Sequence, residues 1–163
     1  MEFSKRKNIR LEKYVYSENG AYFITICTRD KQKLFGHIVG GGAFDAPKVI
    51  LSPQGKIVEK YILSTNNIPN LKVDKYVIMP NHIHLLLSIE NSYGTSWAPS
   101  PTNNKISLAV STLKRFVNKE IGCNVFQRSF YDHVIRNQID YNEIWKYIEN
   151  NPSSWAADEF FSE

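Results

Sequence analysis

The strongest constraint on the fold of this chain is an apolar run over residues 76–87 that carries two histidines, His82 and His84. Successive side chains of a β-strand point to opposite faces, so both histidines share one face, and Ile83 and Leu85 share the other. Two neutral imidazoles that converge beside a strand end suit a divalent cation, since histidine is the commonest metal-binding side chain. Two partly buried strand histidines with one hydrogen bond each also fit the pattern, so both interpretations are open at this stage.

Length and cysteine content favour one intracellular domain. The 163 residues are enough for a single domain whose core needs no disulfide or metal. Cys27 and Cys123 are too few for a disulfide framework, and the sequence contains no Cys-x-x-Cys motif. No apolar stretch approaches the length of a membrane span, and the basic N-terminus has no apolar segment behind it. We therefore expect residues 1–163 to form one soluble cytoplasmic domain without a membrane partner.

Basic residues are concentrated at the N-terminus. The formal net charge of +4 is a small excess by itself. Within residues 1–15, however, Lys5, Arg6, Lys7 and Arg10 face few acidic neighbours. A basic arm of this kind suits a polyphosphate partner such as DNA. Short basic termini are also commonly disordered and solvated, so the arm has two interpretations.

Hydrophobic periodicity predicts the secondary structure. Strands are predicted at residues 21–28, 48–51, 71–79, 82–89 and 129–136. Helices are predicted from Pro53 to a stop before Asn66, from Ile106 to a stop at Gly122, and from about Gln138 to Asn150, with N-caps at Ser52 and Asn137. This mixture of hairpins and helices favours an α+β fold in which helices cover one side of an antiparallel sheet.

Two further segments are polar. Residues 90–104 contain two prolines and little periodicity, so we expect a mobile loop. The helix that begins at Ile106 carries a polar face formed by Ser107, Ser111, Lys114 and Asn118. This polar face fits a solvent-exposed surface as well as a surface that contacts DNA.

Three blocks of the sequence are similar to motifs of one protein family. The block Met79-Pro80-Asn81-His82-Ile83-His84, followed by an apolar strand, resembles the His-hydrophobe-His signature of single-tyrosine HUH nucleases, in particular the REP-associated tyrosine transposases. Residues 130–137 with 147–152 resemble that family's strand and nucleophile helix, and residues 20–28 with 34–36 resemble its opening strand. The resemblance spans nearly the whole chain. It implies a ferredoxin-like sheet of the HUH-endonuclease type, with the nucleophile helix packed beside the two histidines.

The last predicted helix has an apolar arc beside a second arc that carries the candidate functional residues. At ~100° per residue, one arc carries Asp140, Ile144, Tyr147 and Asn151, and the adjoining arc carries Tyr141, Trp145 and Ile148. If the apolar arc packs on the sheet, Tyr147 and Asn151 point along its edge toward the histidines. An arbitrary tyrosine would simply fill the core with its ring. The Tyr-x-x-x-Asn spacing and the similarity to the family's nucleophile motif favour a catalytic role for Tyr147.

The resemblance implies a reaction, a cofactor and a partner. Tyr147 attacks a DNA phosphorus and leaves a 5′-phosphotyrosine bond with a free 3′-hydroxyl, while His82, His84 and Asn151 hold Mg²⁺ or Mn²⁺. A cation meets a chemical need, because a phenol with a pKa near ~10 is a poor nucleophile at neutral pH. The implied partner is single-stranded DNA with a hairpin, and the implied location is the cytoplasm, in association with the nucleoid. Monomer and homodimer both remain open.

Several other polar residues have two interpretations. Lys114 and Arg136 are candidate DNA contacts, although a structural salt bridge explains Arg136 and Asp132 equally well. His133 suits packing or a hydrogen bond as much as a role in the site, and it is not counted as a metal ligand. His37 follows a glycine in a predicted loop and is expected at the surface.

Three functions fit these residues. The main hypothesis is a metal-dependent single-stranded DNA endonuclease and strand transferase that works through Tyr147. The second is a catalytically silent member of the same fold that binds DNA, for example as a regulator. The third is a zinc-dependent hydrolase that uses the same histidines and leaves Tyr147 idle.

Overall fold

The computed structural model describes residues 20–90 and 105–161. The strands are β1 (Gly20–Cys27), β2 (Gly36–Val39), β3 (Lys48–Leu51), β4 (Leu71–Ile78), β5 (His82–Ile89) and β6 (Tyr131–Ile135). The helices are α1 (Pro53–Ser64), α2 (Lys105–Ile121) and α3 (Gln138–Asn150), with the 3-10 turns η1 (Arg29–Lys31), η2 (Thr65–Asn67) and η3 (Asn151–Ala157). The expected basic arm, residues 1–15, and residues 91–104 of the expected mobile loop lie outside the described residues.

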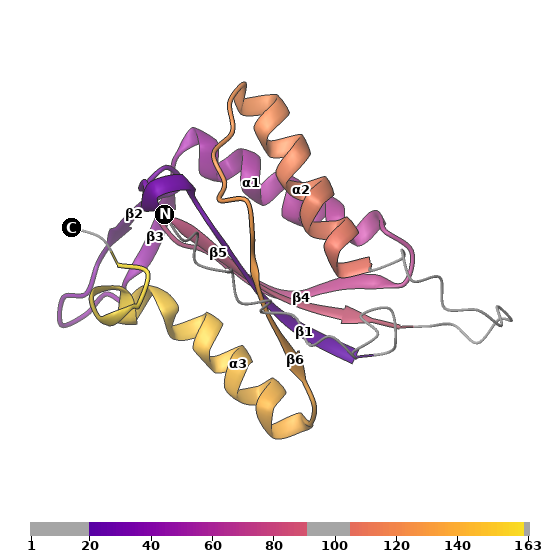
Figure 1. Cartoon of the computed structure of the whole chain (residues 1–163). Coiled ribbons are helices and arrows are strands. Elements are labelled where there is room, and N and C mark those ends of the chain that lie inside the picture. The colour runs from indigo at the N-terminus through magenta and orange to yellow at the C-terminus, as the bar shows by residue number, and fades with distance from the viewer. Residues whose placement is uncertain (1–19, 91–104, 162–163) are drawn as a thin grey trace, which may run out of the picture.

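Four strands form the central sheet, in the order β4-β5-β1-β6. Each pair of neighbours is antiparallel, and β1 pairs with β5 on one side and β6 on the other (Figure 1). The strands β2 and β3 form a separate two-stranded sheet. This architecture confirms the predicted α+β class and its antiparallel sheet.

Helices cover both faces of this sheet, so the prediction that they cover one side is wrong in this respect. Figure 1 shows α1 and α2 side by side on one face and α3 on the other. The composition of β5 gives the physical reason. Leu85 and Leu86 point to opposite faces of the strand and both are buried, so each face needs a cover.

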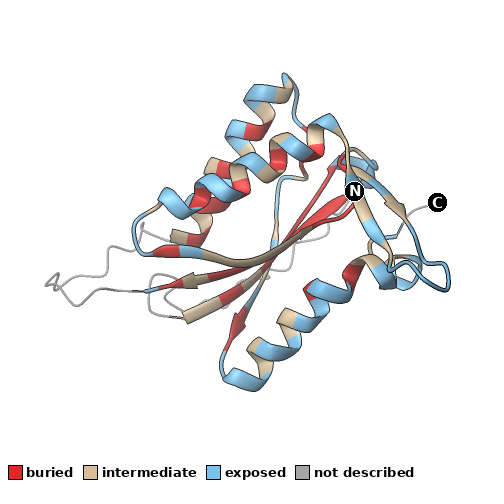
Figure 2. Cartoon of the chain, turned by 180° about the vertical axis from the view of Figure 1, so that it is seen from behind, coloured by how far each residue is buried: buried red, intermediate tan, exposed pale blue. Residues whose placement is uncertain are grey.

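The two faces bury different amounts of apolar surface. Between the sheet and the pair α1 and α2 lies a large cluster that includes Ile24, Leu85 and Leu113. Under α3 the buried members are Leu86, Ile135 and Ile148, with partly buried residues around them. Figure 2 shows buried residues along the sheet and on the inner sides of the helices. The first cluster is the main core.

Local signals set most element boundaries. The Ser52 hydroxyl accepts a hydrogen bond from the Gly55 amide at 3.0 Å, and the Asn137 side chain accepts one from the Asp140 amide at 2.8 Å. Both predicted N-caps are therefore confirmed. Gly122 follows α2 with φ +88°, a conformation that favours glycine.

Two strand predictions need correction. Residues 36–39, predicted as loop because of the glycines around them, form β2, since they pair with residues 48–51 of β3. The predicted strand at 129–136 is shorter, because β6 covers only Tyr131–Ile135. The residues before it turn away to meet the end of β1, where Thr28 and Phe126 form an isolated bridge.

The polar face of α2 packs against this same segment. The ammonium group of Lys114 donates to the carbonyls of Gln127 and Ser129, and the Asn118 carboxamide oxygen accepts from the Val125 amide. The face therefore serves in part to hold the chain that leads into β6. Within the described ranges, none of the helices has both the length and the apolar character needed to cross a membrane.

Candidate active site

His82 and His84 lie at the start of β5 on the face covered by α3. They pair across the sheet with Cys27 and Thr25 of β1, respectively. Both side chains are buried, with exposed fractions of 0% and 1%. Their rings lie 4.6 Å apart, measured between centroids. The two imidazoles therefore share one enclosed site, as the alternation of the strand predicts.

Each imidazole is held by one nitrogen and leaves the other without a partner. His82 Nδ1 lies 2.8 Å from Asn81 Oδ1, and His84 Nδ1 lies 2.8 Å from Thr25 Oγ1. Both Nε2 atoms are buried and have no hydrogen-bond partner among the described residues. Metal-binding histidines are typically oriented in this way, by a hydrogen bond at the nitrogen that does not bind the metal.

Both histidines are neutral at physiological pH. Burial lowers the pKa of His82 to about 4, even though the nearby Asp158 carboxylate favours the charged form. Burial also lowers the pKa of His84 well below its usual value, and the charge of His82 adds to this shift. A neutral imidazole keeps a lone pair on one nitrogen, which is the form that binds a metal.

Oxygen donors from η3 and the residue that follows it complete the cluster. One carboxylate oxygen of Asp158 lies 3.9 Å from His82 Nε2. The potential ligand atoms of His82, His84 and Asp158 all lie within 4.8 Å of one another. Asn151 donates from its amide nitrogen to Asp158 at 3.1 Å, and its buried Oδ1 has no partner in the described part of the chain. Two nitrogens and two oxygens in this arrangement fit a divalent cation.

Tyr147 lies at the exposed border of this cluster. Its ring packs edge-on against His84 at 5.3 Å and against Phe23 at 5.8 Å, while 42% of the residue remains exposed. Burial of the phenol raises its pKa, and the carboxylates of Asp158 and Glu159 raise it further, whereas a polar contact from Asn151 lowers it. The phenol is therefore protonated at neutral pH.

The packing of α3 places Tyr147 and Asn151. Tyr141, Trp145 and Ile148 pack on the sheet, as the apolar arc predicts. Ile144, assigned to the other arc, also contacts this patch. Tyr147 and Asn151 then lie on the side of the helix that faces the histidines.

Sequence reasoning missed the contribution of the residues after α3. The Phe160 ring lies 4.8 Å from the ring of His82 and 6.0 Å from that of His84, and its carbonyl accepts a hydrogen bond from the Asn81 amide at 2.7 Å. Phe160 and Asp158 together close one side of the site. The signal in the sequence is weak, since an acidic pair at Asp158 and Glu159 after a helix is common on protein surfaces.

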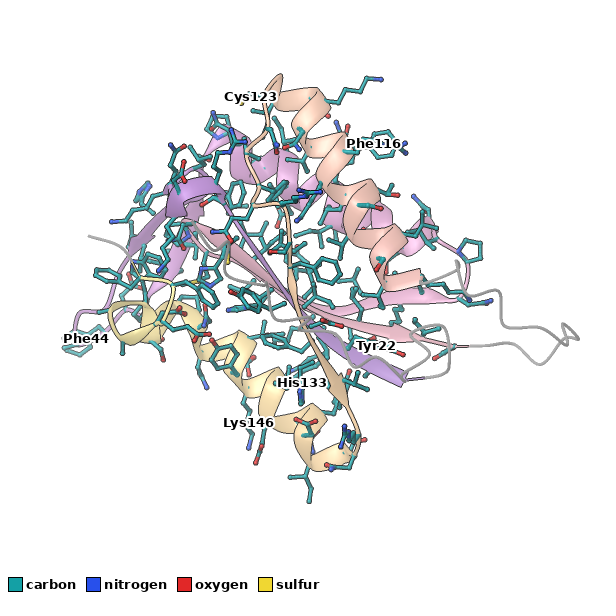
Figure 3. The ribbon with its side chains drawn as sticks, in the orientation of Figure 1. Tyr22, Phe44, Phe116, Cys123, His133 and Lys146 are labelled. Atoms are coloured by element: carbon teal, nitrogen blue, oxygen red, sulfur yellow. The ribbon has the colours of Figure 1, made fainter. Side chains whose placement is uncertain are left out.

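The remaining predicted residues lie apart from this cluster. His133 is exposed on β6, and its Nε2 lies 2.9 Å from an Asp140 carboxylate oxygen, so the histidine connects β6 to α3 (Figure 3). Arg136 is exposed just after β6. Lys114 contacts the segment before β6. His37 is exposed on β2, as expected.

The four basic residues predicted to contact DNA from the N-terminal arm are not among those described. They are Lys5, Arg6, Lys7 and Arg10.

Comparison with known proteins agrees with the class that this fold and site suggest. Residues 47–151 match the family of IS200-like transposases, a span that includes His82, His84, Tyr147 and Asn151. An uncharacterized protein of Haemophilus influenzae is 34% identical over 177 residues, which cover 96% of this chain and 93% of that protein. The chain belongs to the IS200-like transposase family, and the family resemblance found in its motifs is confirmed.

A solved structure shares the fold. It is a REP-associated tyrosine transposase bound to a REP hairpin, and it superposes with a TM-score of 0.61 at 20% identity. The match covers 89% of this chain and 73% of that one. The arrangement of sheet and helices described above is therefore shared with that transposase.

Proposed function

We propose that this transposase-family protein is a metal-dependent single-stranded DNA endonuclease and strand transferase, with Tyr147 as the nucleophile. One observation carries the proposal. Three buried polar atoms without partners in the described residues, His82 Nε2, His84 Nε2 and Asn151 Oδ1, cluster beside an exposed tyrosine. Unsatisfied buried polar atoms are costly, so their clustering in one place calls for a ligand.

His82, His84 and Asn151 would hold the ion, and the carboxylate of Asp158 is a further oxygen donor from the same cluster. A bound divalent ion would neutralise charge on the scissile phosphate and favour departure of the 3′-oxygen. Mg²⁺ and Mn²⁺ both accept such ligands. Two imidazoles are softer than the ligands that magnesium usually prefers, so we expect more activity with manganese.

In the proposed reaction, the hydroxyl oxygen of Tyr147 attacks the phosphorus and forms a 5′-phosphotyrosine bond. The bond from phosphorus to the 3′-oxygen breaks, the phenol proton leaves to solvent, and the 3′-oxygen takes up a proton. The energy of the phosphodiester is kept in the new bond, so another 3′-hydroxyl can later attack it and rejoin the DNA. Packing of Tyr147 against His84 and Phe23 keeps the phenol beside the donor cluster.

The proposed substrate is single-stranded DNA that carries a hairpin. The structurally similar transposase is bound to a REP hairpin. The positive net charge of the chain is consistent with a nucleic-acid partner.

A second candidate function has a specific observation in its favour. Phe160 packs on both histidines, which are almost fully buried. If Phe160 never moved away from the histidines, the protein would bind DNA without cutting it. This is the catalytically silent alternative.

One experiment separates these functions. Short hairpin-bearing single strands with a label at either end are incubated with the protein and Mg²⁺ or Mn²⁺, then run on a denaturing gel. We expect a labelled adduct that survives denaturation and is absent in EDTA. DNA binding without an adduct would favour the silent alternative, and cleavage without an adduct would favour a hydrolase.

A further inference from the structure

A second pocket lies beyond the end of β1, outside the site described above. Its volume is about 630 Å³, and it lies between η1, α2 and the segment that leads into β6. Arg29, Lys114 and Arg128 contribute cationic side chains to its lining, and the carboxylate of Asp30 offsets part of their charge. The result is a concave surface with a net positive charge, which attracts phosphate groups.

Lys114 builds one wall of this pocket. Its ammonium group donates to the carbonyls of Gln127 and Ser129 at 2.8 and 2.9 Å. Burial lowers the pKa of this lysine to about 8, so most of the groups remain charged at neutral pH. Lys114 therefore contributes positive potential while it fixes the backbone.

Arg29 and Arg128 are the residues that can reach a ligand. Both are exposed, and neither forms an ion pair with another residue in the ranges 20–90 and 105–161. A guanidinium group presents a planar fork of donors that matches two oxygens of a phosphate. The two arginines come from two chain segments that both line the pocket, η1 and the segment before β6.

The backbone around the pocket is held in place by the fold. The amide of Arg29 donates to the carbonyl of Val125 at 2.8 Å. The next two residues, Asp30 and Lys31, have φ values of 55° and 54°, which non-glycine residues rarely adopt. Such strain persists where surrounding contacts impose it, and it is common at functional sites.

A direct connection runs from this pocket to the histidines. The side-chain amide of Asn81 donates to the Lys31 carbonyl at 3.4 Å, and its oxygen lies 2.8 Å from His82 Nδ1. The loop that carries Arg29 therefore touches the residue that orients His82.

A second, smaller pocket follows next along the chain, and one of its lining residues contacts Tyr147. Ser129 lines the basic pocket, and two residues later Tyr131 lines a smaller one of about 300 Å³. Phe23, whose ring contacts Tyr147, lines this smaller pocket too. Tyr131 is 47% exposed, so its ring is accessible to a ligand in this smaller pocket.

We infer that Arg29 and Arg128 bind backbone phosphates of the single-stranded DNA that flanks the scissile bond, and that Tyr131 stacks on a base of the same strand. This inference rests on the proposed nuclease function, because it takes the DNA to Tyr147. A single strand fits better than a duplex stem, since its bases are open to stack on an aromatic ring. The concave shape also encloses an extended strand more readily than a wide helix.

The test measures binding without cleavage. Affinities of the full chain for a short oligothymidylate and for a blunt DNA hairpin are measured by fluorescence anisotropy in EDTA, over a series of salt concentrations. The R29A/R128A double variant should bind the oligothymidylate about tenfold more weakly. The slope of log affinity against log salt should become shallower by about 0.7 for each phosphate that the variant no longer neutralises. Hairpin affinity should remain unchanged.

Two further variants make the result specific. Arg115→Ala removes an exposed arginine of α2 that lies over Phe116, away from the pocket, and it should change neither affinity. Tyr131→Ala should weaken oligothymidylate binding without a change in the salt slope, because stacking releases no counterions. Thermal unfolding checks that every variant is folded. We expect R29A/R128A to fold normally, because both arginines are exposed.

Unchanged oligothymidylate binding by R29A/R128A would overturn the inference. Equal reductions in affinity for both DNAs would also overturn it, since the pocket would then bind DNA regardless of strandedness. Neither result bears on the covalent adduct. Conversely, absence of the adduct with the expected difference in binding would count against the proposed nuclease and leave only the contacts to single-stranded DNA standing.

Discussion

The two faces of the central sheet differ in what their buried residues do. The face under α1 and α2 buries aliphatic and aromatic side chains that make up the main core. The face under α3 combines a small apolar patch with two buried histidines and a buried asparagine. Buried polar atoms without hydrogen bonds destabilise a fold, so the second face gives up stability. The difference indicates that one face maintains the structure, whereas the other is built to hold a ligand.

The largest expected effect comes from the histidines. His82→Ala or His84→Ala should lower the rate of DNA cleavage by about 10³-fold or more, since loss of a catalytic ion costs several kcal/mol of transition-state stabilisation. The measurement is adduct formation over time with Mn²⁺. His133→Ala is the matched control, because His133 is exposed and pairs with Asp140. Comparable reductions in all three variants would contradict a metal site at β5.

Substitution of two neighbouring leucines tests the difference between the two faces of the sheet. Leu85→Ala should lower the free energy of unfolding by about 3–4 kcal/mol, because it opens a cavity in the main core. Leu86→Ala should cost about 2 kcal/mol, because the surrounding patch is partly exposed and can relax. Chemical denaturation measures both. Mn²⁺ affinity should fall several-fold only in Leu86→Ala, whose side chain packs beneath α3, and a fall in both variants would remove the distinction.

The oxygen donors should have smaller effects than the histidines. Asn151→Ala and Asp158→Asn should each weaken Mn²⁺ binding by about 10- to 100-fold, at least the loss that follows when a residue supporting a metal ligand is changed. Raising the Mn²⁺ concentration should then restore much of the cleavage. Binding is measured by calorimetry, and the rescue by adduct yield. Loss of cleavage that no Mn²⁺ concentration restores would assign these residues to another role.

A further effect is expected from pH. The raised pKa of Tyr147 means that less than ~10⁻³ of the phenol is ionised at pH 7, and that the fraction rises about tenfold per pH unit below this pKa. The rate of adduct formation should therefore rise with pH between about 6 and 8, with DNA affinity measured in parallel. A flat profile would mean that ionisation of this phenol does not limit the reaction.

Local patterns were sufficient to predict the elements that carry the site. Alternation in β5 puts both histidines on one face, and the Asn137 cap with 3.6-residue spacing sets α3. These signals lie within a few residues of the structure that they predict. Tyr147 and Asn151 could therefore be assigned to one side of the helix before the fold was known.

Other features depend on contacts between distant segments. Periodicity shows that α3 has an apolar side, but not which face of the sheet it covers. β2 forms only because residues 48–51 pair with it. Asp158 has no local pattern, and its relation to His82 arises from the path of the chain after α3. The apolar residues on both faces of β5 were the one available sign that the sheet is covered twice.

The most direct test of the central claim locates the covalent bond. The protein is incubated with hairpin-bearing single-stranded DNA and Mn²⁺, digested, and analysed by mass spectrometry for a peptide that carries a nucleotide. We expect the modification on Tyr147, no adduct with Tyr147→Phe, and a normal yield with Tyr141→Phe, which alters a neighbouring tyrosine of α3. An adduct that persists in Tyr147→Phe, or that maps to Tyr141, would contradict the assignment of the nucleophile.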